Sequence, residues 1–84
     1  MDVKEATEKA IEYFKKFYPN IEKVQLEEVE ITDDDKYWNI VLSYENMETT
    51  PLSYLQIGQQ RTFKVFKIDA DTGKVRSMKI KNIK

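Results

Sequence analysis

The spacing of the apolar residues changes from helical to strand-like after the first 20 or so positions, and this change limits the fold more than any other feature. One helical face carries the apolar residues Val3, Ala6, Ala10, Phe14 and Phe17. From Ile21 onward apolar and polar residues alternate, which is the period of a half-buried strand. The chain therefore predicts one N-terminal helix followed by strands.

The ends and the small residues of the predicted helix indicate how it packs. Asp2 stands three residues before Glu5, which is the spacing of a capping box, and Pro19 ends the segment. The two alanines, set between larger side chains, predict a close approach of the helix to a sheet. We expect Phe14 and Phe17 to cover one face of that sheet.

Four strand-like segments follow, at residues 21–31, 37–44, 62–69 and 74–83. In the first, the alternation slips by one position near Glu27-Glu28, which predicts either a bulge or a strand that crosses from one neighbour to another. The last two segments slip in the same way. In one, the apolar residues change from odd positions (Phe63, Val65) to even positions (Phe66, Ile68), and in the other from Val75 to Met78 and Ile80. Repeated slips predict a strongly bent sheet wrapped round the helix.

These elements predict an α+β fold in which one N-terminal helix packs on a curved antiparallel sheet of about four strands. A chain of 84 residues is too short for two cores, so we expect residues 1–84 to form a single domain. Four Phe, five Tyr and one Trp supply that core with large side chains. One sheet face is expected beneath the helix and the other partly in solvent.

The composition argues against a catalytic or metal site. The chain has no Cys and no His, which removes thiolate nucleophiles, the commonest general base and the usual zinc ligands. Asp33-Asp34-Asp35 is more typical of a solvated turn than of a cation site. The nearby Glu27, Glu28 and Glu30 have no evident cleft in which to act as an acid and base pair. We therefore expect no enzyme activity, no metal and no cofactor.

The N-terminal residues and the overall hydropathy bear on location. No stretch approaches the ~20 apolar residues of a membrane span, so we expect no membrane insertion. Residues 1–5 lack the apolar region of a signal peptide. As written, the chain is expected to be soluble and cytoplasmic, whereas a domain excised from a longer protein would fit the cell envelope or a secreted protein equally well.

The charges are divided between the two halves of the chain. Residues 1–50 hold 6 Lys and 13 Asp or Glu, a net charge of −7, and residues 51–84 hold 8 Lys or Arg and 2 Asp, a net charge of +6. We expect mutual compensation across paired elements. A single-stranded nucleic-acid surface is the weaker interpretation, built on Lys64, Lys67, Arg76, Lys79 and Lys81.

Residues 46–60 form a long connection without a clean period, and such connections tend to be functional. We expect a protein partner to contact its apolar side chains, Leu52, Tyr54, Leu55 and Ile57. An equally weighted interpretation is that these side chains plug a sheet edge. Unpaired edges also allow a homodimer.

A binding pocket between the helix and the sheet is the alternative function. Tyr13, Trp38 and Tyr44 would form the walls of a site for a small ligand. A cavity of a few hundred Å³ between these side chains is what this alternative requires.

The last predicted hairpin resembles a known family. Val65 to Val75 places an apolar strand before Asp69-Ala70-Asp71-Thr72-Gly73-Lys74, and this is similar to the closing strand, turn and strand of PepSY domains. Gly73 stands where a short hairpin needs a positive φ. The resemblance implies a cystatin-like helix-on-sheet shape and a non-enzymatic, protein-binding domain that restrains peptidases or serves as an accessory module. It implies no catalytic residues.

Overall fold

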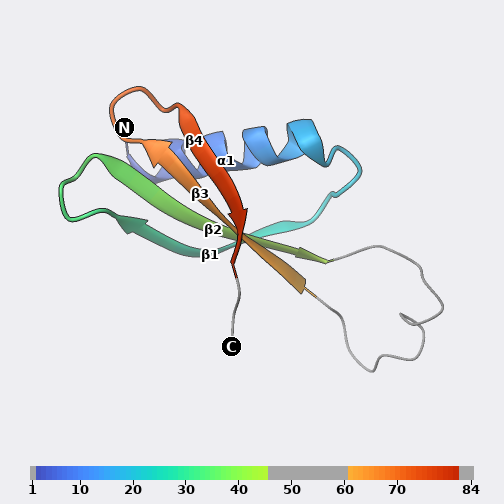
Figure 1. Cartoon of the computed structure of the whole chain (residues 1–84). Coiled ribbons are helices and arrows are strands. Elements are labelled where there is room, and N and C mark those ends of the chain that lie inside the picture. Colours follow the sequence, from blue (N-terminus) through green and yellow to red (C-terminus); the bar gives the residue numbers. More distant parts are fainter. Residues whose placement is uncertain (1, 46–60, 82–84) are drawn as a thin grey trace.

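The computed structural model describes residues 2–45 and 61–81, which form one helix and four strands. The elements are α1 (Val3–Phe17), β1 (Val24–Ile31), β2 (Tyr37–Glu45), β3 (Arg61–Asp69) and β4 (Val75–Ile80). The strands lie in the order β1-β2-β3-β4, each antiparallel to its neighbour, and α1 lies against one face of the sheet (Figure 1). The α+β prediction is confirmed.

Helix α1 begins and packs as its sequence predicts. Asp2 is the N-cap, and its Oδ1 accepts a hydrogen bond of 2.9 Å from the Glu5 backbone N–H. Ala6 and Ala10 are completely buried, so the backbone of the helix lies close to the sheet. The helix ends at Phe17, where the next residue, Tyr18, is the C-cap.

Aromatic side chains fill the space between α1 and the sheet. Phe14 is fully buried, and its ring centroid lies 4.9 Å from those of both Tyr18 and Tyr44 and 6.4 Å from that of Phe66. Offset and edge contacts of this kind add to the free energy gained by burying the rings. Phe14 is thus the centre of the core.

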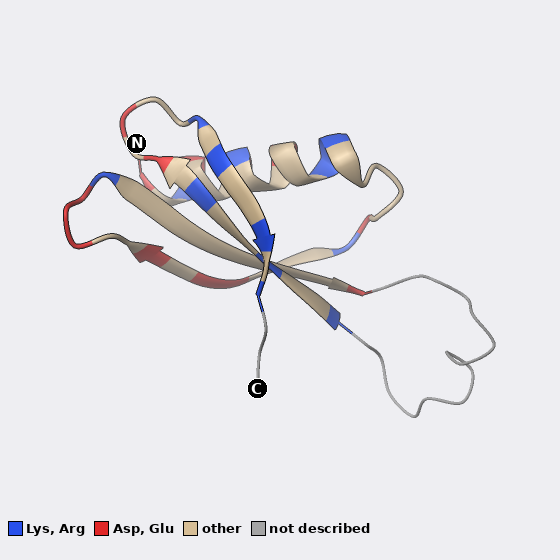
Figure 2. Cartoon of the chain, viewed as in Figure 1, with Lys and Arg blue, Asp and Glu red and all other residues tan. Residues whose placement is uncertain are grey.

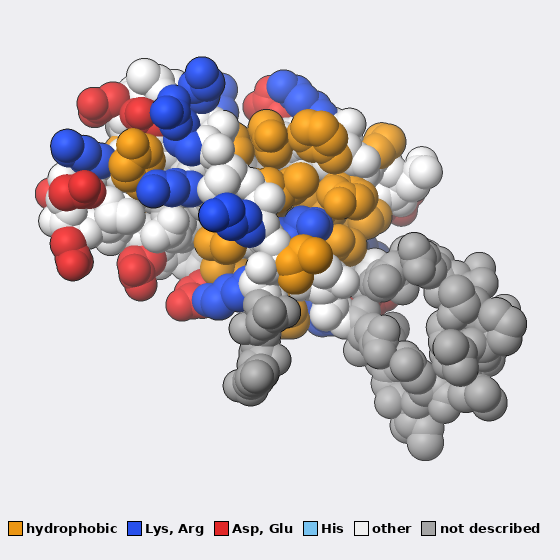
Figure 3. All heavy atoms as spheres, viewed as in Figure 1, with side chains coloured by type: hydrophobic (Ala, Val, Ile, Leu, Met, Phe, Trp, Pro, Cys, Tyr) orange, Lys and Arg blue, Asp and Glu red, His pale blue; other side chains and the backbone are white. Residues whose placement is uncertain are grey.

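The prediction that Phe17 also covers the sheet is wrong. Phe17 is 57% exposed, and Val3 at the other end of the same stripe is 42% exposed. Because the sheet is twisted, a straight helix stays close to it only over its middle turns. Figure 3 shows apolar side chains gathered over the C-terminal half of α1.

The slip predicted in the first strand is a bulge. Leu26 pairs with Leu42 and Glu28 pairs with Val41, which leaves Glu27 without a partner on β2. β1 pairs with the same neighbour on both sides of the bulge, so the alternative of a strand that changes neighbours does not hold.

A second bulge lies in β4, but β3 has none. Lys67 pairs with Ser77 and Ile68 with Val75, so Arg76 is the extra residue. β3 keeps one register with β2 throughout, and the predicted slip in β3 is wrong. Its apolar residues instead divide between the two faces. Val65 of β3 therefore lies on the face away from α1, beside its register partner Val41. That face also accommodates apolar side chains, since Val41 is only 4% exposed.

The two tight turns follow from their sequences. Gly73 has φ of 75°, as predicted, and its N–H donates to the Asp69 carbonyl at 2.9 Å. In the β1–β2 turn, Asp35 has φ of 60°, and the Asp34 carboxylate accepts from the Thr32 hydroxyl and the Lys36 N–H. Both turns are stabilised by a carboxylate that caps backbone N–H groups.

Acidic and basic strands form opposite edges of the sheet. Figure 2 shows Asp and Glu along β1 and Lys and Arg along β4. β1 and β4 are not neighbours, so their charges do not meet between directly paired strands, whereas Glu45 of β2 and Arg61 of β3 are register partners joined by an ion pair of 3.6 Å. Compensation also occurs across the face, where the Lys81 Nζ lies 2.7 Å from the Glu28 Oε2.

Among the described residues, no helix is long and apolar enough to cross a membrane.

Candidate functional site

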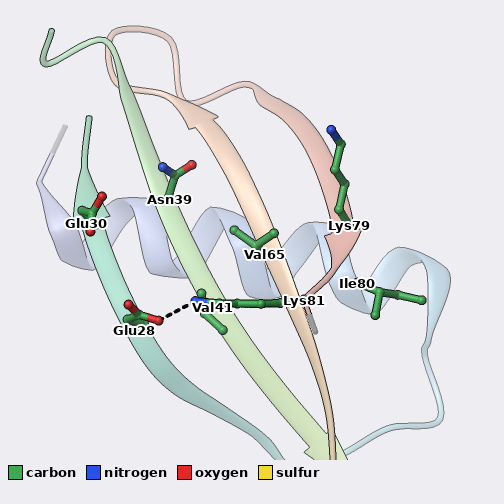
Figure 4. Close-up of a pocket in the computed structure, with 8 residues that line it drawn as sticks. All are labelled: Glu28, Glu30, Asn39, Val41, Val65, Lys79, Ile80 and Lys81. Atoms are coloured by element: carbon green, nitrogen blue, oxygen red, sulfur yellow. Dashed lines mark hydrogen bonds and ion pairs between the residues drawn. The ribbon is translucent and has the colours of Figure 1, made fainter. Parts of the chain in front are cut away.

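The sheet face opposite α1 is hollowed into a trough. The strand registers align Glu28, Val41, Val65 and Lys79 in one row across all four strands. A cavity of about 460 Å³ lies over this row, with α1 behind the sheet (Figure 4). The row therefore runs from a carboxylate on β1, over two valines, to an ammonium on β4.

Further charges extend the two walls of the trough. Glu30 lies two residues beyond Glu28 on β1, and Lys81 lies two residues beyond Lys79. The Lys81 side chain crosses the face to reach Glu28 (Figure 4). It closes one end of the trough, and the floor beneath is apolar apart from Asn39.

A polar network lies beyond that closed end. The Ser43 hydroxyl is completely buried although it faces away from α1; it donates to Glu27 at 3.0 Å and accepts from Arg61 at 2.9 and 3.2 Å. Arg61 also lies 3.6 Å from Glu45, its register partner. The bulge in β1 thus places Glu27 where it helps to hold the ends of β2 and β3 together.

The carboxylates of Asp34 and Asp69 accept hydrogen bonds from groups of their own turns. The hydroxyl of Thr32, followed by the backbone N–H of Lys36, lowers the pKa of Asp34 below the ordinary aspartate value. The backbone N–H groups of Thr72 and Asp71 lower the pKa of Asp69 in the same way. Within residues 2–45 and 61–81, no group of three or more carboxylates is placed to hold a metal ion.

We expect acid to destabilise the domain through these two aspartates. Because their pKa values are lower in the folded chain than in the unfolded one, the unfolded chain binds protons first as the pH falls. Their stabilising effect is complete above the ordinary aspartate range of about pH 4 and is lost as the pH falls through the folded values. Urea unfolding of wild type, Asp34→Asn and Asp69→Asn across this range should show a difference that shrinks in acid. If the difference in the free energy of unfolding between wild type and the variants did not change with pH, this prediction would be wrong.

The three residues of the predicted ligand pocket lie in different surroundings. Tyr44 packs in the core against Phe14, and burial raises the pKa of its phenol. Tyr13 contacts Phe17 and Phe66. Trp38 lies six residues from Tyr44 on β2, about 20 Å along a strand, so the structure does not bring the two together.

Neither of the two cavities described is lined by Tyr13, Trp38 or Tyr44. The indole Nε1 of Trp38 is buried and has no hydrogen-bond partner among the described residues. The geometry therefore offers the small-ligand alternative no support.

The basic residues considered for nucleic-acid binding are divided between the two sheet faces. Lys64 is 7% exposed on the α1 side, with its Nζ 5.4 Å from the centroid of the Tyr18 ring. Lys67 lies on the opposite face, 4.4 Å over the ring of Tyr37. A continuous basic and aromatic surface for single strands is not formed by these residues.

The predicted partner-binding residues Leu52, Tyr54, Leu55 and Ile57 lie outside the described residues. The structure does describe the strands that lead into and out of their segment. Close to the end of β2, a second cavity of about 380 Å³ is lined by Glu45 and by residues 20–23 of the α1–β1 connection.

A comparison with known protein families confirms the resemblance to PepSY domains that the last hairpin suggested. The PepSY family, described as "Peptidase propeptide and YPEB domain", matches residues 6–79. The chain belongs to the PepSY family. The match runs from the buried alanine in the first turns of α1 to Lys79 in β4, so it includes every element of the fold. No curated protein and no solved structure matches the chain.

Membership in the PepSY family bears on chemistry. PepSY domains are generally non-catalytic propeptide or accessory modules. In this PepSY chain the described carboxylates pair with lysine or arginine, accept from hydroxyls or backbone N–H groups, or face solvent. The charged row across the open face lies on the surface of this PepSY domain.

Sequence reasoning missed the two assemblies on the open face of this PepSY domain. The row that contains Val41 and Val65 depends on the register of four strands, which alternation alone does not set. Two features of the sequence could have indicated the Ser43 network. The alternation slips at Glu27 in the acidic strand, and Ser43 is a single serine among the apolar residues of the next strand.

Proposed function

We propose that this domain is a non-catalytic protein-binding module, of the peptidase-propeptide or accessory kind, which contacts its partner through residues 46–60 and the adjoining sheet edge. The observation that carries the proposal is the PepSY match over residues 6–79. A family of peptidase propeptides points to a peptidase-related protein as the partner.

The described frame around this segment supports the proposal. Glu45 and Arg61 are register partners joined by an ion pair, and Arg61 is also held by the buried Ser43. The described residues on either side of the segment, Glu45 and Arg61, are therefore held side by side on neighbouring strands. Binding residues placed on a rigid scaffold lose less conformational entropy when a partner is bound.

The apolar composition of the segment supplies the contact itself. Leu52, Tyr54, Leu55 and Ile57 are the side-chain types that anchor protein interfaces when they enter a partner's pocket. The cavity beside Glu45 lies next to the base of the segment and extends the available surface.

The test is capture of a partner by the purified domain, followed by titration with that purified partner. We expect the variant Leu52→Ser/Tyr54→Ser/Leu55→Ser/Ile57→Ser to weaken binding by at least about a hundredfold, since anchors of this kind cost roughly 2 kcal/mol or more each. Calorimetry measures the affinity, and circular dichroism checks that the fold is retained.

The matched control is Val3→Ser/Ile31→Ser. It removes exposed apolar side chains from the opposite end of the domain and should leave the affinity unchanged. Undiminished capture by the quadruple variant would contradict the proposed contact. Recovery of only a second copy of the chain would assign the surface to a homodimer and overturn the peptidase-related partner.

A further inference from the structure

The trough on the open face separates charge by sign across an apolar floor. Glu28 and Glu30 stand on β1, and Lys79 stands on β4, with Val41 and Val65 between them. Three strand spacings of about 4.8 Å separate the two edge strands. A ligand of one charge sign would be attracted by one wall and repelled by the other, so the trough suits an occupant that carries both signs on opposite sides.

The charges differ in whether they are already paired. Lys81 and Glu28 form an ion pair 2.7 Å long at one end of the trough. Within residues 2–45 and 61–81, neither Glu30 nor Lys79 has an ion-pair partner. The open end therefore presents one carboxylate on β1 and one ammonium on β4, with the two central strands between them (Figure 4).

The spacing along each wall matches that of an extended peptide. Residues two apart on a strand lie about 6.6 Å apart, and this separates Glu28 from Glu30 and Lys79 from Lys81. An extended peptide repeats its side chains at the same interval, with alternate residues on opposite sides. The volume of about 460 Å³ falls within the ordinary range of ligand sites.

We propose that the trough binds an extended peptide segment in which basic and acidic side chains alternate. The basic side chains pair with Glu30 and, in exchange for Lys81, with Glu28; the acidic ones pair with Lys79 and with the released Lys81, and the segment lies over Val65. This surface lies on described strands and includes none of residues 46–60, so the proposal goes beyond the proposed function and does not rest on it.

The probe is a pair of blocked synthetic peptides of the same composition. In one, Lys and Glu alternate, so an extended chain carries all its Lys on one side. In the other, the order is Lys-Lys-Glu-Glu, so both sides carry both charges. We expect the alternating peptide to bind about tenfold more tightly at low salt, where exposed charges are least screened. Amide shifts in a nuclear magnetic resonance titration should fall on Asn39, Val41 and Val65.

Two charge reversals separate the trough from the overall charge of the domain. Glu30→Lys gives both walls at the open end the same sign, and we expect it to weaken the alternating peptide about tenfold. Glu12→Lys makes the same change of net charge on α1, and we expect no effect. Both side chains are exposed, so the fold should be retained.

A full exchange of the walls provides the positive test. Glu28→Lys/Glu30→Lys/Lys79→Glu/Lys81→Glu keeps the division of charge, and an extended peptide entering in the opposite direction should bind with wild-type affinity. Equal affinity for the two peptides, equal losses in the two single variants, or amide shifts away from the trough would overturn the proposal. Partner capture through residues 46–60 would be untouched by any of these results.

Discussion

Replacing Phe14 by alanine is expected to lower the free energy of unfolding by about 3–5 kcal/mol, which is a large part of the total stability of a domain of this size. The side chain is fully buried, and its ring contacts those of Tyr18, Tyr44 and Phe66. The variant loses the transfer free energy of the ring and also leaves a cavity that the rigid sheet cannot close.

Phe17→Ala is the matched control, because it removes the same side chain from the same helix at a position that is 57% exposed. We expect that change to cost no more than about 1 kcal/mol. Urea unfolding followed by circular dichroism measures both. Similar losses for the two variants would mean that Phe14 is not the centre of the core.

Enlarging Ala10 to leucine should destabilise the domain by about 1–3 kcal/mol, although leucine forms helices almost as well as alanine. Ala10 is completely buried where α1 approaches the sheet. A leucine there must push the helix away from the strands or adopt a strained rotamer, and either change disturbs the packing around Phe14.

The neighbouring Lys9→Leu variant provides the comparison. Lys9 is exposed on α1, so leucine should fit there with a change within about 0.5 kcal/mol. Thermal unfolding of the two variants at one protein concentration decides the matter. An Ala10→Leu variant as stable as wild type would show that the helix does not lie as close to the sheet as described.

Elements whose cause is local could be predicted from the sequence. The cap at Asp2, the buried alanines and the positive φ of Gly73 each depend on a few neighbouring residues. Phe17 and β3 were predicted wrongly because their surroundings depend on the twist of the whole sheet. Alternation shows which residues share a face, but not how much of that face a curved sheet covers.

The features of the open face were harder to predict for the same reason. Glu28 and Lys81 are 53 positions apart, and only the curvature of the sheet brings their charged groups into contact. Val41 and Ser43 lie on the face that was expected to be partly in solvent, yet both are buried. The acidic and basic halves of the chain were evident from the residue counts, whereas their meeting over a valine floor required the strand registers.

The two bulges have a consequence for polymerisation. Glu27 interrupts β1 and Arg76 interrupts β4, so both outer strands of the described sheet carry an extra, charged residue. Amyloid-like growth requires a straight edge whose backbone groups match an incoming strand over its whole length. A domain that leaves Leu26 and Val29 exposed at one edge would otherwise be open to such growth. The two bulges thus oppose fibril formation.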